Sequence, residues 1–191
     1  MPWSRDHKAQ TREKIIDAAA AAFRARGAGS VALSDVMKEA GLTHGGFYAH
    51  FKSKDDLIAA ALKSVNETRL ARFHGAPSRG GVSKLDAAID VYLTSRHREH
   101  PEAGCTIATL GSELARDSGK ARAQIDANAR AWLATFAECA PGLTQASRTR
   151  EATGAFAAMI GGLILARAVE DPHEADRILA DVRAFLHGAL G

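Results

Sequence analysis

Cysteine, aromatic residues and long apolar runs are scarce in this chain of 191 residues. Its two cysteines, Cys105 and Cys139, are too few for a disulfide framework, so we expect a reducing, cytoplasmic setting. No apolar run reaches the roughly 18 residues of a membrane span. The most apolar stretch, 156–169, is interrupted by two glycines. The charged residues at 5–8 precede no apolar segment, so we expect neither a secretory signal nor membrane association.

Signature motifs of common enzymes are also missing. The sequence contains no G-x-S-x-G, Walker A, G-x-G-x-x-G or H-E-x-x-H pattern. The acidic pair Asp55 and Asp56 opens a helical segment, where carboxylates cap rather than catalyse. His97, His100 and Cys105 could suggest a metal site, but the charged residues around the histidines indicate a solvated helix end. We predict a protein that is not an enzyme and that carries no metal or other cofactor.

Helical periodicity dominates what is present. Hydrophobic residues make up 46% of the chain and charged residues 25%, which suits one or two compact domains. Apolar residues recur on one helical face in segment after segment, and none shows the alternation typical of a strand. The expected helices lie at about 15–23, 35–40, 43–51, 54–73, 83–97, 105–116, 121–139, 148–169 and 173–190, with a loop containing Gly75, Pro77, Ser78, Gly80 and Gly81. The sequence therefore predicts an all-α fold.

Positive charge is concentrated near the N-terminus. Residues 1–54 contain nine Lys or Arg and five Asp or Glu, a net charge of +4, whereas the remainder carries −1. A small basic module on a nearly neutral body favours binding to a polyanion such as nucleic acid, with ordinary solvated surface as the alternative.

The segment 34–57, SDVMKEAGLTHGGFYAHFKSKDDL, predicts a helix-turn-helix. Ser34 is a suitable N-cap for the first short helix, and Gly41 can supply the positive φ that a tight turn requires. Thr43 can cap the second short helix, and Ser53 the helix that follows.

Two adjacent glycines, Gly45 and Gly46, distinguish the second short helix. Each costs a helix about 1 kcal/mol relative to alanine. We expect them to provide a bare surface on which the backbone can approach a partner closely. The alternative is that they merely fray the helix against the core. The groups beside this surface can all form hydrogen bonds: Thr43, His44, Tyr48 and His50.

The segment GLTHGGFYAHFKSKDDL resembles the signature of the tetracycline-repressor (TetR) family of transcriptional regulators. The matching positions are Gly41, Leu42, Thr43, Phe47, Tyr48, Phe51, Lys54, Asp55 and Leu57. The motif-level resemblance covers about residues 8–62. One departure is Gly46, which stands where a Thr or another side chain often occurs, so that few side chains face the bases. The resemblance implies an N-terminal three-helix DNA-binding module, 1–53, and a C-terminal helical effector-binding and dimerisation domain, 54–191, joined through the helix 54–73.

The same resemblance implies roles for single residues. Thr43, Tyr48 and His50 would contact phosphates, as would the helix starts at Ser34 and Lys54. His44 is the candidate for a base edge, with Gly45 and Gly46 giving close approach. Alternatives are that Tyr48 belongs to the core, that His50 is a solvated helix end and that Lys54 is ordinary surface. The DNA-binding candidates are thus Ser34, Thr43, His44, Gly45, Gly46, Tyr48, His50 and Lys54.

The last two expected helices, 148–169 and 173–190, suit a dimer interface. The first is apolar over more than one face and needs partners on both sides. Two such helices from each of two chains would form a four-helix interface, and a single short recognition helix makes too few contacts for a specific DNA site. A plain intramolecular core is the alternative. The interface candidates are Phe156, Ile160, Leu163, Ile178, Val182 and Phe185.

The effector site is less well defined. Side chains that could line a pocket, each also explained as plain core, are Tyr92, Ile107, Leu110, Trp132, Phe136 and Met159. Cys105 opens a helix, where the dipole lowers the pKa of a thiol and raises its reactivity. Some TetR-family regulators carry a Gly-Cys at this helix start. The alternative is a small buried hydrophobe, and Cys139 is expected to be structural.

These features predict a ligand-responsive regulator. It would be a homodimeric repressor, released from an inverted-repeat operator in double-stranded DNA by a small-molecule effector. One alternative is a redox- or electrophile-sensing repressor triggered through Cys105. An all-helical protein-interaction adaptor is the alternative from another class, although the segment 43–51 lacks the exposed apolar stripe that such a protein would show.

Overall fold

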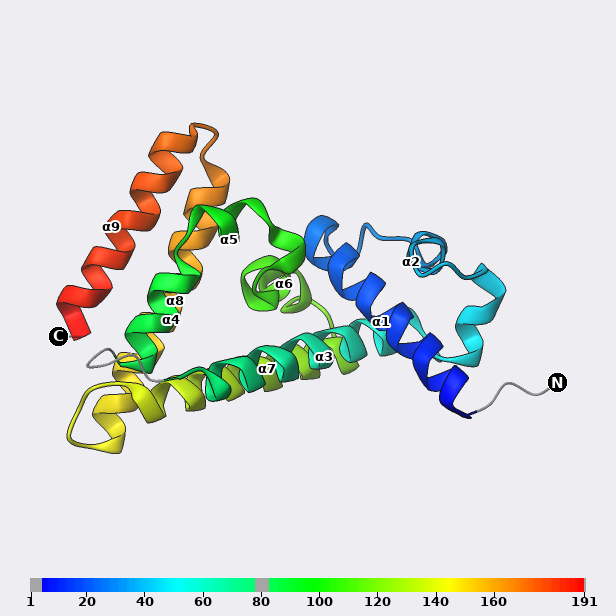
Figure 1. Cartoon of the computed structure of the whole chain (residues 1–191), viewed down its shortest axis with the longest axis horizontal. Coiled ribbons are helices and arrows are strands. Elements are labelled where there is room, and N and C mark those ends of the chain that lie inside the picture. The colour runs from blue at the N-terminus through cyan, green and yellow to red at the C-terminus, as the bar shows by residue number, and fades with distance from the viewer. Residues whose placement is uncertain (1–4, 78–82, 191) are drawn as a thin grey trace. The chain divides into compact units, whose positions relative to one another are not determined.

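The structure, a computed structural model of the chain, describes residues 5–77 and 83–190, so Ser78, Gly80 and Gly81 of the expected loop lie outside the described residues. Over these ranges the fold is all-α, as predicted (Figure 1). The α-helices are α1 (Arg5–Arg26), α2 (Leu33–Glu39), α3 (Lys54–Gly75), α4 (Lys84–Tyr92), α5 (Ser95–Glu99), α6 (Thr106–Leu114), α7 (Lys120–Cys139), α8 (Gln145–Ala168) and α9 (Pro172–Leu190). Two 3-10 helices, η1 (His44–Ala49) and η2 (Pro101–Ala103), complete the described elements.

The chain folds as two compact units, each built from two segments. The first unit combines Met1–Thr68 with Cys105–Asn128, and the second combines Arg69–Gly104 with Ala129–Gly191. Helices α3 and α7 therefore contribute to both units. Whether the functional division follows the expected boundary at residue 53 stays a prediction.

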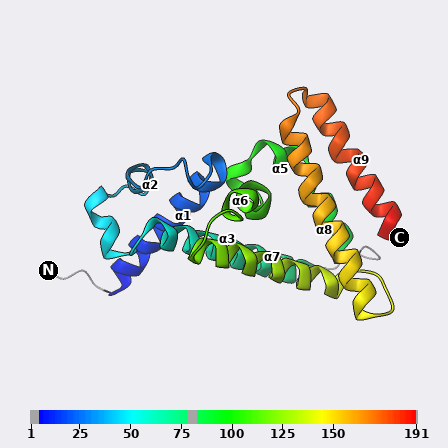
Figure 2. The ribbon, with the colours of Figure 1, turned by 180° about the vertical axis from the view of Figure 1, so that it is seen from behind.

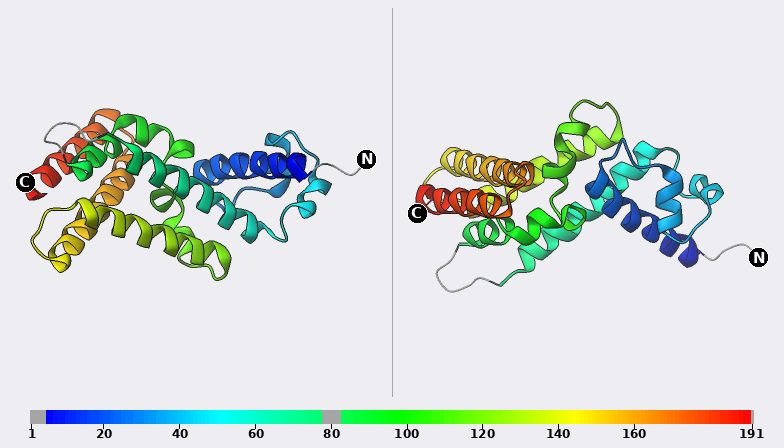
Figure 3. Two further views of the ribbon diagram at one scale, coloured as in Figure 1. Left: turned by 60° about the horizontal axis from the view of Figure 1, so that its bottom comes forward. Right: turned by 90° about the horizontal axis from the view of Figure 1, so that it is seen from above.

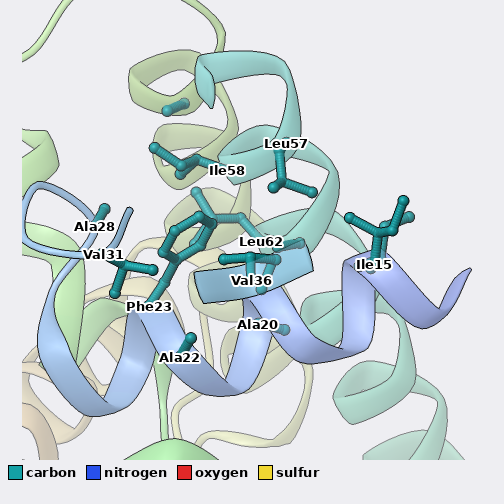
Figure 4. Packing of buried hydrophobic residues seen from close by; sticks show 14 of the residues in the cluster. Ile15, Ala20, Ala22, Phe23, Ala28, Val31, Val36, Leu57, Ile58 and Leu62 are labelled. Atoms are coloured by element: carbon teal, nitrogen blue, oxygen red, sulfur yellow. The ribbon is translucent and has the colours of Figure 1, made fainter. Parts of the chain in front are cut away.

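One apolar cluster forms the core of the first unit. The face of α1 expected from the sequence is buried, with Ile15 and Phe23 almost fully covered. Phe23 packs among Val36 of α2 and Leu62 of α3 (Figure 4). Leu110 and Leu114 of α6 and Ile125 of α7 belong to the same cluster. The core that positions the helix-turn-helix is thus larger than the predicted three-helix module.

In the second unit, α8 and α9 lie side by side (Figures 2 and 3). Thr144 and Ser147 form a reciprocal capping box at the start of α8. A Cβ on Gly162 would lie 3.1 Å from both Cγ atoms of Val182, so glycine lets the two helices approach closely. Arg167 donates to the carbonyl oxygens of His97 and Arg98, which are left open at the end of α5.

Two expected helix boundaries were wrong. Ser34 is not an N-cap, because α2 begins at Leu33 and Ala32 occupies the extended N-cap position. The expected helix 83–97 ends at Tyr92 because Leu93 has non-helical φ −88° and ψ 68°. Thr94 then caps α5 by accepting the His97 N–H at 3.2 Å. Local capping therefore overrode the apolar periodicity that ran through both helices.

One described helix, α8, is long and apolar enough to cross a bilayer, with a mean hydropathy of 1.2 over its most apolar window. Of that window, 39% is buried inside the chain, chiefly on the side that packs within the second unit. A single helix of this kind is weak evidence for a span, because core helices have the same length and composition.

Candidate nucleic-acid interface

The turn after α2 has the geometry that the sequence predicted. Gly41 has φ +73°, and no atom of the described residues lies within 4 Å of a Cβ placed on it, so the requirement for glycine is conformational. The Gly41 N–H donates to Lys38 O at 3.0 Å and the Leu42 N–H to Met37 O at 2.8 Å. These two bonds are the Schellman motif, which satisfies the last carbonyls of α2 and turns the chain toward η1.

The recognition segment η1 has one apolar side and one hydrogen-bonding side. Phe47 and Phe51 are buried and stack with ring centroids 5.7 Å apart. Tyr48 lies edge-on to Phe47 but is 69% exposed, so the interpretation of Tyr48 as a core residue was wrong. Thr43 and His44 are exposed as well. The side of η1 that faces away from the core therefore offers a hydroxyl, an imidazole and a phenol.

The glycine pair serves no packing need among the residues that the structure describes. A Cβ on Gly45 would meet nothing within 4 Å, and one on Gly46 would only touch Met37 Cε at 3.7 Å. The segment is a 3-10 helix rather than the expected α-helix, and Thr43 occupies the N-cap position without a side-chain capping bond. Because glycine disfavours the α-helix, the pair accounts for this difference. What the glycines provide is an unobstructed surface beside His44.

His50 follows η1 and is half-buried. Burial is the main cause that lowers the pKa of its imidazole, and the nearby cations Lys8 and Arg12 lower this pKa further. Its Nδ1 is buried and has no hydrogen-bond partner among the described residues. His50 is therefore a neutral imidazole at pH 7 with one unused polar atom, rather than a fully solvated helix end.

Lys54 and Ser34 are placed differently. Ser34 is exposed on α2. Lys54 is half-buried, and its Nζ donates to Gly29 O at 3.2 Å, so it is more than ordinary surface. Ser53 caps α3 as predicted, with its Oγ accepting the Asp56 N–H at 3.1 Å.

The loop between α1 and α2 is held by a carboxylate that the sequence analysis missed. Glu113 of α6 accepts the N–H of Ala28 at 3.1 Å and the N–H of Gly29 at 2.5 Å. A Cβ on Gly27 or Gly29 would lie 3.2 or 3.1 Å from the Glu113 oxygens, so small residues flank the site. The only sequence signal was the Gly-Ala-Gly run itself.

Asp55 forms a second tertiary link of the same kind. Its two carboxylate oxygens accept the N–H groups of Lys120 and Ala121, both at 2.9 Å. Asp55 thus caps α7 instead of its own helix, while Lys120 Nζ pairs with Asp56. That contact lowers the pKa of Asp56 and raises the pKa of Lys120. The segment 113–121 is therefore linked to the α1–α2 loop at one end and to the first turn of α3 at the other.

Known proteins match both halves of the chain. Residues 15–61 match the family described as bacterial regulatory proteins, tetR family, and residues 81–182 match the tetracyclin repressor-like C-terminal domain. An HTH-type transcriptional regulator of Mycobacterium tuberculosis strain H37Rv is 30% identical over 187 residues, covering 94% of this chain and 95% of that protein. The chain belongs to the TetR family. It is a DNA-binding transcriptional regulator, not an enzyme.

Other relatives agree with this assignment. TtgR of Pseudomonas putida is 40% identical over 65 residues, which is 34% of this chain and 31% of TtgR. A TetR transcriptional regulator of Chloroflexus aurantiacus has a TM-score of 0.76 at 27% identity and covers 94% of this chain and 96% of its own. One from Legionella pneumophila has a TM-score of 0.81 at 19% identity over the whole of both chains, which shows the shared TetR fold.

The predicted dimer contacts of this TetR-family chain divide into two groups. Leu163 is 0% exposed and Phe156 is also buried, so both are already covered within one chain and were wrong as contact residues. Ile160, Ile178 and Val182 are half-buried, whereas Phe185 is 68% exposed. The exposed apolar neighbours on α8 are Ile164 and Leu165, which lie one and two positions after Leu163.

Cys105 occupies the N-cap position of α6, as the sequence suggested, but its side chain makes no capping bond. It is only 6% exposed, which fits the interpretation as a small buried hydrophobe. Cys139 is half-buried and lines an open hollow of about 180 Å³ with Ser83, Leu85, Asp86, Pro141 and Leu190. Burial raises the pKa of the Cys139 thiol, which keeps it protonated at neutral pH.

The candidate pocket residues are divided between the two units of the described structure. Leu110 lines a cavity of about 10 Å³ in the first unit, roughly the room of one water. Trp132 and Phe136 pack with Phe73 in the second unit at centroid distances of 5.6–5.8 Å. Met159 is fully buried, Tyr92 lies edge-on to His97 and Ile107 packs against the core of the first unit. An effector pocket formed by these residues stays a prediction.

Proposed function

We propose that this regulator acts as a homodimeric repressor in the cytoplasm, bound to an inverted-repeat operator and released by a small-molecule effector. The observation that supports it most is the outward side of η1, where Thr43, His44 and Tyr48 surround the open surface of Gly45. Hydroxyl and imidazole groups next to an unobstructed backbone suit a groove edged by phosphates and base edges. An adaptor helix would instead present apolar side chains.

Residue roles follow from this arrangement. Thr43, Tyr48 and His50 contact phosphates, together with the helix starts at Ser34 and Lys54. His44 reads a base edge, with Gly45 and Gly46 giving access. Because Lys54 also holds the α1–α2 loop, its contribution to phosphate binding includes the positioning of that loop.

The dimer interface is formed by α8 and α9, through exposed Ile164, Leu165 and Phe185 together with half-buried Ile160, Ile178 and Val182. These side chains lie on the two helices that pack together in the second unit. Two copies would bury them in a four-helix arrangement, which removes apolar surface from water. A two-fold dimer would place two recognition segments about 34–36 Å apart, one turn of DNA.

The experiment that tests DNA reading begins with selection of bound sequences from random duplex DNA by the pure protein. On the selected site, His44→Ala should relax the preference at particular base pairs by about 1–3 kcal/mol. His173→Ala, an exposed histidine on α9, is the matched control and should change nothing. If His44→Ala keeps the full base preference of the wild type, η1 does not read bases through this residue.

A further inference from the structure

The first turns of α1 lie outside the core that explains the rest of this helix. Burial in α1 begins at Thr11 and Ile15, whereas residues 6–10 are exposed. A helical extension without burial gains little stability of its own. It carries Lys8 and Arg12, four residues apart and therefore on one face of the helix.

Arg12 is fixed beside the end of the recognition segment. Its guanidinium carbon lies 4.8 Å from the centroid of the Phe51 ring, and Phe51 in turn stacks on Phe47 of η1. A cation over an aromatic face is a stable arrangement that costs little of the cation's hydration at a partly open site. The side chain remains 43% exposed, and its Nη1 lies 3.9 Å from the Glu13 carboxylate, a long ion pair. Most of its hydrogen-bonding capacity is thus available to a ligand.

Lys8 and Arg12 also act on His50 of the neighbouring element. Both cations lower the pKa of this imidazole, as burial does, and no carboxylate is among the causes of the shift. The buried Nδ1 of His50 has no hydrogen-bond partner among the described residues. Lys52, exposed two residues further on, adds positive charge to the same end of η1. An anion that neutralises Lys8 and Arg12 would remove their part of the lowering and place a negative charge beside His50, which favours the protonated imidazole against the larger effect of burial.

We propose that Lys8 and Arg12 bind a DNA backbone phosphate outside the helix-turn-helix, and that His50 takes up a proton when this phosphate is bound. The inference rests on the proposed DNA interface and extends it to α1. Guanidinium and ammonium groups form charge-assisted hydrogen bonds with phosphate oxygens, and a protonated His50 adds another donor. The phosphate contact fixes the orientation of η1 on the duplex and carries no sequence information.

The proton uptake has a definite sign. The complex holds up to one proton more per protomer than the free protein, so DNA affinity rises as the pH falls, by at most about tenfold per pH unit and protomer. The salt dependence follows from the same contacts. Each phosphate contact that is lost should reduce the slope of log affinity against log salt concentration by about 0.9.

The test compares wild type with Lys8→Ala, Arg12→Ala and Lys14→Ala on the selected operator and on random duplex, at about 50 to 200 mM salt. Lys14 is the matched control, because it is an exposed lysine on the same helix but two residues from Arg12 and on a different face. Lys8→Ala and Arg12→Ala should weaken both DNAs by the same factor and flatten the salt slope, whereas Lys14→Ala should do neither. Arg12→Lys should restore most of the slope.

Proton uptake is tested by repeating the DNA-binding titration at several pH values between about pH 8 and pH 6, where histidine titrates. Wild type should bind more tightly at the lower pH. His50→Gln should lose that dependence, whereas His74→Gln, a change at an exposed histidine on α3, should keep it.

A wild type that binds no DNA at any salt concentration would overturn the proposed function itself. Wild-type binding with Lys8→Ala and Arg12→Ala indistinguishable from Lys14→Ala, or with equal affinity at both pH values, would overturn this inference alone.

Discussion

The two compact units differ in what they leave exposed. Of the six large hydrophobic side chains that the described residues leave exposed, five lie in the second unit: Val91, Leu143, Ile164, Leu165 and Phe185. The sixth, Tyr48 in the first unit, carries a hydroxyl and sits on η1. The first unit therefore completes its apolar core within one chain and presents polar groups, as a DNA reader requires. The second unit leaves apolar surface that suits a protein partner.

The units also differ in how distant segments are connected. In the first unit, the carboxylates of Glu113 and Asp55 each accept two backbone N–H groups from distant segments. In the second, the guanidinium of Arg167 donates to two carbonyls at the end of α5, beside the half-buried His97. We therefore expect substitutions at these sites to affect one unit and to leave the other unchanged.

The largest effect is expected on the dimer. Leu165→Glu would bury an uncompensated charge in the proposed interface, at a cost of about 3 kcal/mol or more, which corresponds to a factor of ~100. We expect monomers in sedimentation equilibrium and an operator affinity at least about a hundredfold lower. Leu143→Glu, on a residue that is fully exposed in a loop, is the control. A Leu165→Glu protein that sediments like wild type would exclude this face as the interface. Leu163→Glu is unsuitable because it would unfold the core.

The second effect concerns acid stability and belongs to the second unit. Burial is the main cause that lowers the pKa of His97 to about 4, with Arg69 and Arg167 acting in the same direction, although its ring donates to Tyr92 O at 2.8 Å, which raises the pKa. The unfolded state therefore binds more protons than the folded state between about pH 6.5 and pH 4, and stability falls as the pH falls through this window. The loss amounts to at most about 3 kcal/mol.

Urea unfolding of wild type and His97→Asn at a series of pH values measures this effect. The wild type should lose stability below about pH 6.5, and His97→Asn should lose distinctly less. His187 differs from His97, because its pKa is raised rather than lowered. Hydrogen bonding to Asp90 is the main cause of this rise, and Asp86 acts in the same direction. Equal acid sensitivity in both proteins would mean that His97 is not the group responsible.

The third effect concerns the first unit. Glu113→Ala leaves the N–H of buried Ala28 without its acceptor, which should cost about 1–3 kcal/mol of unfolding free energy. Glu67→Ala removes an exposed ion pair with Lys63 at 3.8 Å and should cost less than about 0.5 kcal/mol. Chemical denaturation of both variants gives the comparison. Equal costs would show that the α1–α2 loop does not depend on α6.

The smallest effect is expected at Cys105. Because its thiol is buried, wild type and Cys105→Ser should respond equally when treated with a quinone, an aldehyde or hypochlorite before a DNA-binding assay. Selective release of wild type would instead establish the alternative of a sensor triggered through Cys105.

Features set by neighbouring residues could be predicted from the sequence. The Schellman turn at Gly41, the buried face of α1 and the Ser53 cap each follow from residues within one or two helical turns. The contact between Glu113 and Ala28 joins residues 85 positions apart, so no local pattern announces it. The same holds for Asp55, which the sequence placed correctly at a helix start but whose carboxylate caps another helix.

The interface residues show a different limit of prediction from the sequence. Apolar periodicity identified α8 and α9 but could not tell the side that packs inside the chain from the side left exposed. Leu163 and Leu165 are equally apolar. Only the path of the neighbouring helices determines that Leu163 is buried in the core and that Leu165 is exposed on the surface. Similarly, the break at Leu93 lies within a periodic apolar pattern and depends on the Thr94 cap.

The mass of the protein–operator complex tests most directly whether the first unit reads DNA while the second unit pairs two chains. Native mass spectrometry of wild type on the selected inverted repeat should show two chains per duplex or a multiple of two. Leu165→Glu under the same conditions should show weakly bound single chains, whereas His44→Ala should retain pairs. A wild-type complex with one chain per duplex, or Leu165→Glu bound as pairs with wild-type affinity, would contradict this division of roles.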